Sequence, residues 1–273
     1  MYEPLDALPL WGLLLAAALL LGLALEIGYR SGRWRHVQTP DEKEQPVGAM
    51  VASILGLLAL VLAFTFSLAA SRFDDRRKTV LAEANAIGTT YLRSRLLPEP
   101  QRAEIARLLR EYVDVRIEAI EEGKLEGALG RSEQLHELLW RQTGGLAEKD
   151  SASIITGVFI QALNDMIDLH AERVQVGMRS RIPLVIWAGL FGLAMLSMAA
   201  VGYQSGISAT SRSPAMPGLV LAFAIVLAII ADLDRPREGL LQVSQQAMID
   251  VQKSMQPTQL NQNRFNSDNP SSY

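Results

Sequence analysis

Four long segments of the chain contain no Asp, Glu, Lys or Arg. They cover residues 7–25, 47–71, 182–211 and 213–231. A helix rises about 1.5 Å per residue, so about 20 apolar residues cross the roughly 30 Å hydrocarbon core of a bilayer. Buried helices of water-soluble proteins rarely reach this length without a single charge. The pattern therefore predicts an all-α membrane protein whose chain crosses the bilayer four times.

The first segment is predicted to remain in the protein as a span. The residues before it include Glu3 and Asp6 but no Lys or Arg, whereas a secretory signal begins with a basic region. Basic residues follow the apolar segment instead, at Arg30, Arg33 and Arg35. A start of this kind favours an uncleaved transmembrane helix over a signal peptide.

The composition excludes several classes of chemistry. The chain has no cysteine, so disulfides, thiolate catalysis and cysteine-based metal sites are ruled out. Its net charge of −3 provides no basic field for nucleic acid. His36, His136 and His170 lie far apart in the sequence without the spacing of metal ligands, and no phosphate-binding loop, nucleophile elbow or zinc-protease motif occurs. We therefore expect no enzyme, no cofactor and no nucleic-acid partner.

Basic residues near the ends of the four spans predict the orientation of the chain. One side would hold Arg72, Arg76, Arg77, Lys78, Arg173, Arg179, Arg181, Arg235 and Arg237, and the other Arg30, Arg33, Arg35, Lys43 and Arg212. Because the cytoplasmic side carries the excess of Lys and Arg, both termini and the long central segment are predicted to be cytoplasmic. The predicted location is the cell membrane, which several helices of the chain would cross.

Breaks in the apolar pattern divide the chain into nine segments. They are a first transmembrane helix at 1–29, a loop at 30–46, a second transmembrane helix at 47–71, a cytoplasmic helical domain at 72–181, a third transmembrane helix at 182–203, a loop at 204–214, a fourth transmembrane helix at 215–233, a cytoplasmic helix at 234–255 and a tail at 256–273. The tail is rich in Asn, Gln, Ser and Pro, which predicts disorder.

The second transmembrane helix is predicted to continue into the central domain. No proline occurs between residues 47 and 97, and apolar residues keep a helical spacing beyond the span. Pro98 and Pro100 would end the helix. Farther along, the glycines predict a break at 123–130 and a helix end at Gly144 and Gly145.

Small residues form a stripe along the second span at spacings of three and four. They are Ala49, Ala52, Gly56, Ala59, Ala63, Ser67 and Ala70. Small residues allow helix backbones to approach closely in lipid, so one interpretation is a packing seam. The other interpretation is that this face lines a pore, with Leu60 and Phe64 as constrictions.

Charged residues follow the second and fourth spans. The cluster at 71–78 is interpreted as interfacial side chains whose charges reach water. Asp232 and Asp234 beside Arg235 indicate a local charge network, with a second possibility that a bent backbone brings both carboxylates to one cation. A polar run at 164–172 is interpreted as a solvated helix face.

The second span and its charged exit resemble the bestrophin channels. Arg72, Phe73, Asp74 and Asp75 stand at that family's Arg-Trp-Trp-type motif, Arg77 and Lys78 at its Arg-Lys pair, and Asn85 at its Asn, without a gap. Leu233, Asp234, Arg235 and Pro236 resemble the family's Ile-Glu-Asn-Pro segment, while residues 83–89 and 96–100 are typical of the bacterial bestrophin-like group. Phe73 and Asp74 depart from the paired tryptophans, and Arg237 replaces the Phe after the proline.

The resemblance implies an ion channel in a bacterial inner membrane. It implies a homopentamer in which the second helix of each subunit lines a central pore for small inorganic ions. Gly56, Leu60 and Phe64 would form the hydrophobic neck, although Gly56 lacks the bulk of the family's residue, and Arg72, Asp74 and Asp75 would form the pore mouth. The alternative is a membrane-anchored interaction or signalling module without channel activity, in which the small-residue stripe only packs helices.

Overall fold

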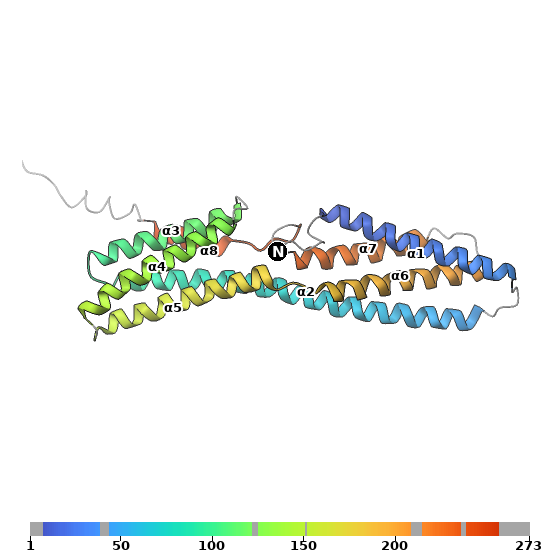
Figure 1. Cartoon of the computed structure of the whole chain (residues 1–273), viewed down its shortest axis with the longest axis horizontal. Helices are drawn as coiled ribbons and strands as arrows, with labels where there is room; N and C mark the ends of the chain where they lie inside the picture. The colour runs from blue at the N-terminus through green and yellow to red at the C-terminus, as the bar shows by residue number, and fades with distance from the viewer. Residues whose placement is uncertain are drawn as a thin grey trace, which may run out of the picture. The chain divides into compact units, whose positions relative to one another are not determined.

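The computed structural model describes residues 8–38, 44–121, 125–150, 152–208, 215–235 and 239–256. Its helices are α1 (Leu10–Gln38), α2 (Glu44–Ser94), α3 (Gln101–Glu121), α4 (Leu125–Lys149), α5 (Ile154–Val174), the π-helix η2 (Gln175–Arg179), α6 (Leu184–Ile207), α7 (Ala215–Asp234) and α8 (Gln246–Met255) (Figure 1). No strand occurs among these described residues. The all-α prediction is confirmed.

The chain divides into two compact units. The first comprises residues 1–76 and 176–243, and we call it the transmembrane unit. The second comprises residues 77–175 and 244–273, and we call it the helical unit. The predicted tail at 256–273 lies almost wholly outside the described residues, which end at Gln256.

The transmembrane unit contains α1, α6, α7 and the first part of α2. Within the described residues, four helices are long and apolar enough to cross a membrane, namely α1, α2, α6 and α7. Their shared core includes Leu21, Leu58, Trp187, Ala224 and Leu227, all with at most 2% of their surface exposed. The prediction of four spanning helices is confirmed by their length and apolar composition.

Four glycines allow α1 and α6 to touch backbone to backbone. A Cβ atom built on Gly28 would lie 2.0 Å from the Ala199 carbonyl oxygen, and one built on Gly202 would lie 2.0 Å from that of Leu25. Gly32 and Gly206 repeat this arrangement one turn farther on. Small residues four apart on each helix are the geometry that close helix packing in lipid requires. α6 extends to Ile207 and therefore includes the first residues of the predicted loop at 204–214, among them Gly206.

The helical unit contains the rest of α2 together with α3, α4, α5 and α8. α3 packs against α4 and α8, and α4 packs against α5. The core is apolar, and its fully buried members include Ile87, Leu108, Leu109, Leu135, Phe159 and Leu163. Ser153 caps α5 by accepting a hydrogen bond from the Thr156 amide at 3.3 Å. The predicted continuation of the second helix is confirmed, since α2 runs unbroken to Ser94.

Glycines do not interrupt α4, contrary to the break and helix end that we predicted. Gly127, Gly130, Gly144 and Gly145 all lie inside Leu125–Lys149. A glycine costs a helix interior about 1 kcal/mol relative to alanine, which is too little to end a helix whose apolar face is buried. That face carries Leu135, Leu139 and Leu146, each at most 4% exposed.

The last helix is shorter than expected. α8 occupies Gln246–Met255, residues 239–245 are not helical, and residues 236–238 lie outside the described part of the chain. Two hydrogen bonds among the described residues attach α8 to α3 and α2. Gln252 Nε2 donates to Asp114 Oδ1 at 2.7 Å, and the Tyr91 hydroxyl donates to the Met255 carbonyl at 3.2 Å.

Candidate functional site

One face of α2 is buried and the opposite face is exposed along the whole transmembrane part. The buried positions recur at helical spacing, at Val51, Leu58, Leu62, Thr65 and Ala69. A helix presents residues three and four apart on the same side. The remaining side of α2 therefore faces away from α1, α6 and α7.

The predicted neck residues lie on this exposed face. Leu60 is 53% exposed and Phe64 is 68% exposed, and a Cβ atom on Gly56 would meet nothing within 4 Å. The three positions are four residues apart, so they form a line along the helix. Most residues of the small-residue stripe are exposed as well. Close packing of small residues within the subunit occurs between α1 and α6, at Gly28, Gly32, Gly202 and Gly206, which we call the glycine seam.

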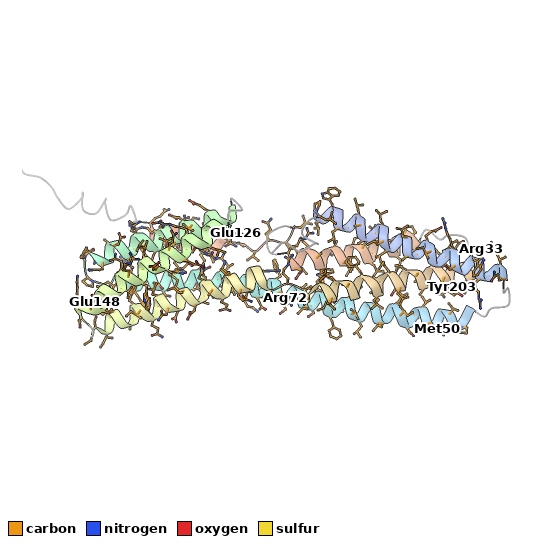
Figure 2. The ribbon with its side chains drawn as sticks, in the orientation of Figure 1. Arg33, Met50, Arg72, Glu126, Glu148 and Tyr203 are labelled. Atoms are coloured by element: carbon orange, nitrogen blue, oxygen red, sulfur yellow. The ribbon has the colours of Figure 1, made fainter. Side chains whose placement is uncertain are left out.

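The predicted mouth residues differ in burial. Asp74 and Asp75 are exposed, whereas Arg72 is partly buried. Figure 2 shows Arg72 toward one end of the transmembrane unit, with Arg33, Met50 and Tyr203 toward the other. Of the remaining motif positions, Phe73 packs against the transmembrane core, while Arg77, Lys78 and Asn85 are exposed.

Two arginines satisfy the carbonyl groups at the end of α7. Arg76 is 4% exposed and donates to the carbonyl oxygens of Asp234, at 3.0 Å, and Leu233. Arg181 Nη1 donates to the same Asp234 carbonyl at 3.0 Å. The last carbonyls of a helix lack partners within it and carry partial negative charge. The cluster at 71–78 is thus not only interfacial, because Arg76 is part of the packing.

Asp232 and Asp234 hold different segments of backbone. Asp234 Oδ1 accepts from the Ile182 amide at 3.0 Å, ahead of α6. Asp232 accepts from the amides of Leu240 and Leu241 at 3.0 and 3.2 Å. Among the described residues, no group of three His, Cys, Asp or Glu side chains could hold a metal ion. The arrangement supports a local network for each carboxylate, and Pro236 and Arg237 lie outside the described residues.

Gly239 is required where the chain turns back to Asp232. Its φ of 139° is a conformation that L residues rarely adopt, and a Cβ atom there would lie 1.8 Å from Asp232 Oδ1. The absence of a side chain lets the backbone approach the carboxylate. The Asp232 side chain therefore holds residues 239–241 beside it.

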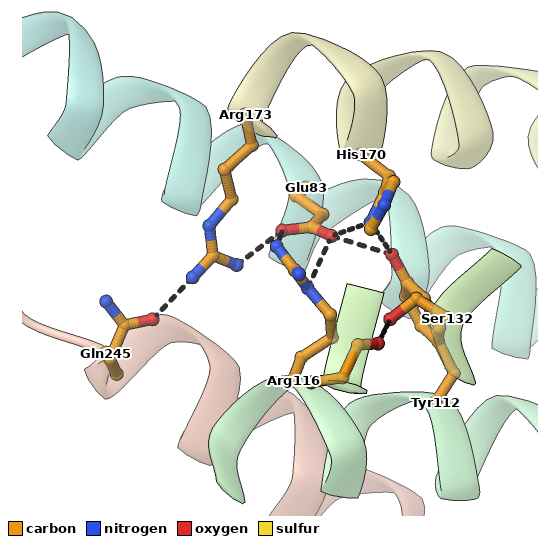
Figure 3. Close-up of polar contacts among 8 residues, drawn as sticks. Glu83, Tyr112, Arg116, Ser132, His170, Arg173 and Gln245 are labelled. Carbon is orange, nitrogen blue, oxygen red and sulfur yellow. Dashed lines mark hydrogen bonds and ion pairs between the residues drawn. The ribbon is translucent and has the colours of Figure 1, made fainter. Parts of the chain in front are cut away.

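A buried ionic cluster organises the helical unit, and we call it the Glu83 cluster (Figure 3). Glu83 on α2 has no exposed surface and pairs with Arg116 on α3 and Arg173 on α5. The Nε atom of Arg116 lies 3.2 Å from Glu83 Oε1. Arg173 Nη2 also donates to Gln245 Oε1 at 2.8 Å, just before α8. One carboxylate thus connects three helices directly and the segment before α8 through Arg173.

Tyr112 and two histidines complete the cluster. The Tyr112 hydroxyl donates to Glu83 Oε1 at 2.7 Å and lies 2.9 Å from His170 Nδ1. Because the hydroxyl proton goes to Glu83, Nδ1 of His170 is the donor in the second bond. The His136 ring lies 4.8 Å from that of His170 and 5.0 Å from that of Tyr112, between ring centroids.

Burial changes the ionisation of this cluster. Burial, together with the neighbouring His170, lowers the pKa of His136 to about 4. Burial and the charge of Glu83 raise the pKa of Tyr112. The His136 and Tyr112 side chains are therefore neutral at pH 7.

Sequence reasoning identified the phrase around Glu83 but not its role. A signal was present, because Glu83 falls between Val80 and Ile87 on the buried side of α2. The expected solvated face at 164–172 is correct for Asp165 and Asp168, which are exposed, whereas His170 turns inward. The contact between His136 and His170 joins residues on two different helices and has no signature in spacing.

Comparison with known proteins agrees with this architecture. The family model of the Bestrophin-like domain matches residues 11–248. A crystal structure of a substituted bacterial bestrophin homologue from Klebsiella pneumoniae has a TM-score of 0.66 at 16% identity, covering 89% of this chain and 97% of that one. The structure of the Klebsiella pneumoniae homologue phased with zinc has a TM-score of 0.62 at 17% identity, covering 89% and 96%. At this identity the likeness shows the fold, and none of the curated proteins compared matches the chain.

Proposed function

Since the chain belongs to the bestrophin-like family, we propose that it is an ion channel in which α2 of each subunit lines a central pore. The observation that carries the proposal is the exposed apolar face of α2, with Leu60 and Phe64 pointing away from the other helices of the subunit. A ring of subunits would bring these faces together around one axis. The fold shared with bacterial bestrophin homologues supports the same arrangement.

The neck would be formed by Gly56, Leu60 and Phe64. A narrow apolar constriction controls ion passage by wetting and dewetting. Phe64 has the largest side chain of the three and would make the neck narrowest at its position. Gly56 has no side chain, so the neck would be widest there. The neck carries no charge, so it would act on small inorganic ions through its width and its water content.

The mouth would be formed by Arg72, Asp74 and Asp75. The exposed carboxylates of Asp74 and Asp75 would set the local field in a ring repeated by each subunit. We propose that this end faces the cytoplasm, with both termini on the same side of a bacterial inner membrane. The homopentamer is proposed from the family resemblance.

Ion flux tests the channel directly. Purified protein in liposomes should pass small ions, and Phe64→Ala should raise the flux because it widens and wets the neck. Leu19→Ala is the matched control, because Leu19 on α1 is 67% exposed in the subunit but would face lipid. No flux above that of empty liposomes, across a range of pH and calcium concentration, would overturn the proposal.

Subunit number separates the channel from the alternative. Native mass spectrometry should show an oligomer with enough subunits to enclose a pore, and a pentamer by resemblance. A monomer or dimer would favour a membrane-anchored interaction or signalling module, in which the exposed face of α2 serves another contact.

A further inference from the structure

A cavity of about 320 Å³ lies in the transmembrane unit, where the apolar span of α2 gives way to charged residues. Its lining consists of Arg72, Asp75, Val176, Ser180 and Arg181. Val176 belongs to the π-helix η2 (Gln175–Arg179), and Ser180 and Arg181 lie between η2 and α6. Short π-helical turns occur frequently at functional sites, because they displace the backbone from regular helix geometry.

Arg72, which lines this cavity, also carries a buried nitrogen, Nη1, without a partner among the described residues. A buried guanidinium nitrogen without a partner is uncommon and calls for a water, ion or ligand that accepts its hydrogen bond. Neither exposed carboxylate next to it in sequence, Asp74 or Asp75, is bonded to that nitrogen.

The charge of the lining favours an anion. Two guanidinium groups, Arg72 and Arg181, outnumber the single carboxylate of Asp75. Arg76 adds one further positive charge and Asp234 one negative charge, and the Asp234 Oδ2 atom lies 3.7 Å from Arg181 Nε. The local charge therefore stays positive.

We propose that this cavity binds a phosphate-bearing ligand. Arg72 and Arg181 would pair with its oxygens, and the Ser180 hydroxyl would add a hydrogen bond. The planar fork of a guanidinium matches the spacing of phosphate oxygens and binds them more strongly than a neutral donor does. The phosphate comes either from a free anion or from the headgroup of a phospholipid, since the cavity lies beside the ends of the membrane-spanning helices.

Binding of inorganic phosphate tests the site in the full-length protein. Isothermal titration calorimetry in dodecyl maltoside, a detergent without phosphate, should show saturable binding at constant ionic strength. Arg72→Gln should weaken it by at least about tenfold, because a charge-assisted contact is lost. Ser180→Leu should also weaken phosphate binding by at least about tenfold, because the larger side chain fills the cavity without changing any charge. Arg95→Gln removes an exposed charge elsewhere and should leave the affinity within about twofold.

A second arm identifies the source of the phosphate. Added phosphatidylglycerol should raise the melting temperature of the wild type more than that of Arg72→Gln or Ser180→Leu, if the ligand is a headgroup. Binding of phosphate or phosphatidylglycerol that depends on both residues supports the site. The proposed site is overturned if the wild type binds neither phosphate nor phosphatidylglycerol, or if Ser180→Leu binds the ligand as well as the wild type does. Neither arm measures conduction, so the outcome is independent of the channel proposal.

Discussion

Glu83 shows how much one side chain contributes to the helical unit. It is fully buried, and it accepts from Tyr112 while pairing with Arg116 and Arg173. Breaking a buried ion pair by removing one partner is strongly destabilising, because the other charge remains buried without compensation. Here two guanidinium groups would be left in that state.

Glu83→Gln should therefore lower the free energy of unfolding by about 3 kcal/mol or more. Chemical unfolding of the full-length protein, followed by circular dichroism, measures this. The matched control is Glu104→Gln on α3, whose carboxylate forms an exposed pair with Arg107 at 2.7 Å. Exposed pairs contribute about 0–1 kcal/mol, so the control should stay close to wild type. Equal losses in the two variants would contradict the role given to the cluster.

His136 makes the helical unit sensitive to acid. Its pKa is about 4 in the folded protein and about 6.5 in an unfolded chain. The unfolded chain therefore binds the proton first, and stability falls as the pH decreases from about 6.5 to about 4. Linkage gives a loss of about 3 kcal/mol across this window, with no further loss from His136 below it.

Melting temperatures between pH 7.5 and 4 measure the effect. His136→Gln should flatten the slope between pH 6.5 and 4, because the titrating group is gone. His36→Gln on α1, outside the helical unit, serves as the control for replacing a histidine. An unchanged slope in His136→Gln would refute the assignment.

At the scale of elements, the glycine seam between α1 and α6 determines how the transmembrane unit packs. A Cβ atom on Gly202 would lie 2.0 Å from the Leu25 carbonyl and 2.8 Å from the Tyr29 amide nitrogen. Both atoms belong to a helix backbone, which cannot rotate away as a side chain can. The two helices must separate to admit even one methyl group.

Gly202→Ala should destabilise the detergent-solubilised protein by about 1–3 kcal/mol, the usual cost of overpacking. Gly189→Ala in the same helix is the control, because its Cβ would meet nothing within 4 Å. Alanine is the better helix former by about 1 kcal/mol, so the control should be unchanged or slightly more stable. Size-exclusion chromatography after heating ranks the variants, and a stable Gly202→Ala would show that the seam tolerates separation.

At the scale of the whole molecule, apolar residues that are exposed in the subunit would face two different environments, water or lipid. Phe64 on α2 and Leu19 on α1 are 68% and 67% exposed in the subunit. In the proposed channel Phe64 borders water at the axis, whereas Leu19 remains in lipid. The natural chain has no cysteine, so single cysteines can report on these environments without background.

Phe64→Cys should react with a water-soluble methanethiosulfonate reagent in proteoliposomes, and the reaction should change the ion flux. Leu19→Cys should react slowly and leave the flux unaltered, because lipid excludes the charged reagent. Mass spectrometry measures the extent of labelling alongside the flux. Equal protection of both cysteines would place the face of α2 away from an aqueous axis.

The sequence alone determined which parts of this protein cross a membrane and how far α2 continues. Those properties depend on local composition, because apolar length sets a span and the absence of proline permits an unbroken helix. The register of Gly56, Leu60 and Phe64 along one face also follows from helical periodicity. Their exposure in the subunit does not, since it depends on which side of α2 the other helices cover.

The tertiary structure decided the partners of the charged and small residues. Glu83 meets Arg173 across 90 residues of sequence, and Gly28 meets Ala199 on another helix. Asp232 and Asp234 are two residues apart, yet each carboxylate binds a different segment of backbone. Contacts of this kind arise from packing between helices, and the spacing of residues along one helix does not predict them. Thus composition and periodicity determined the four crossings, and long-range packing alone decided which charges are buried and which face of α2 is left open.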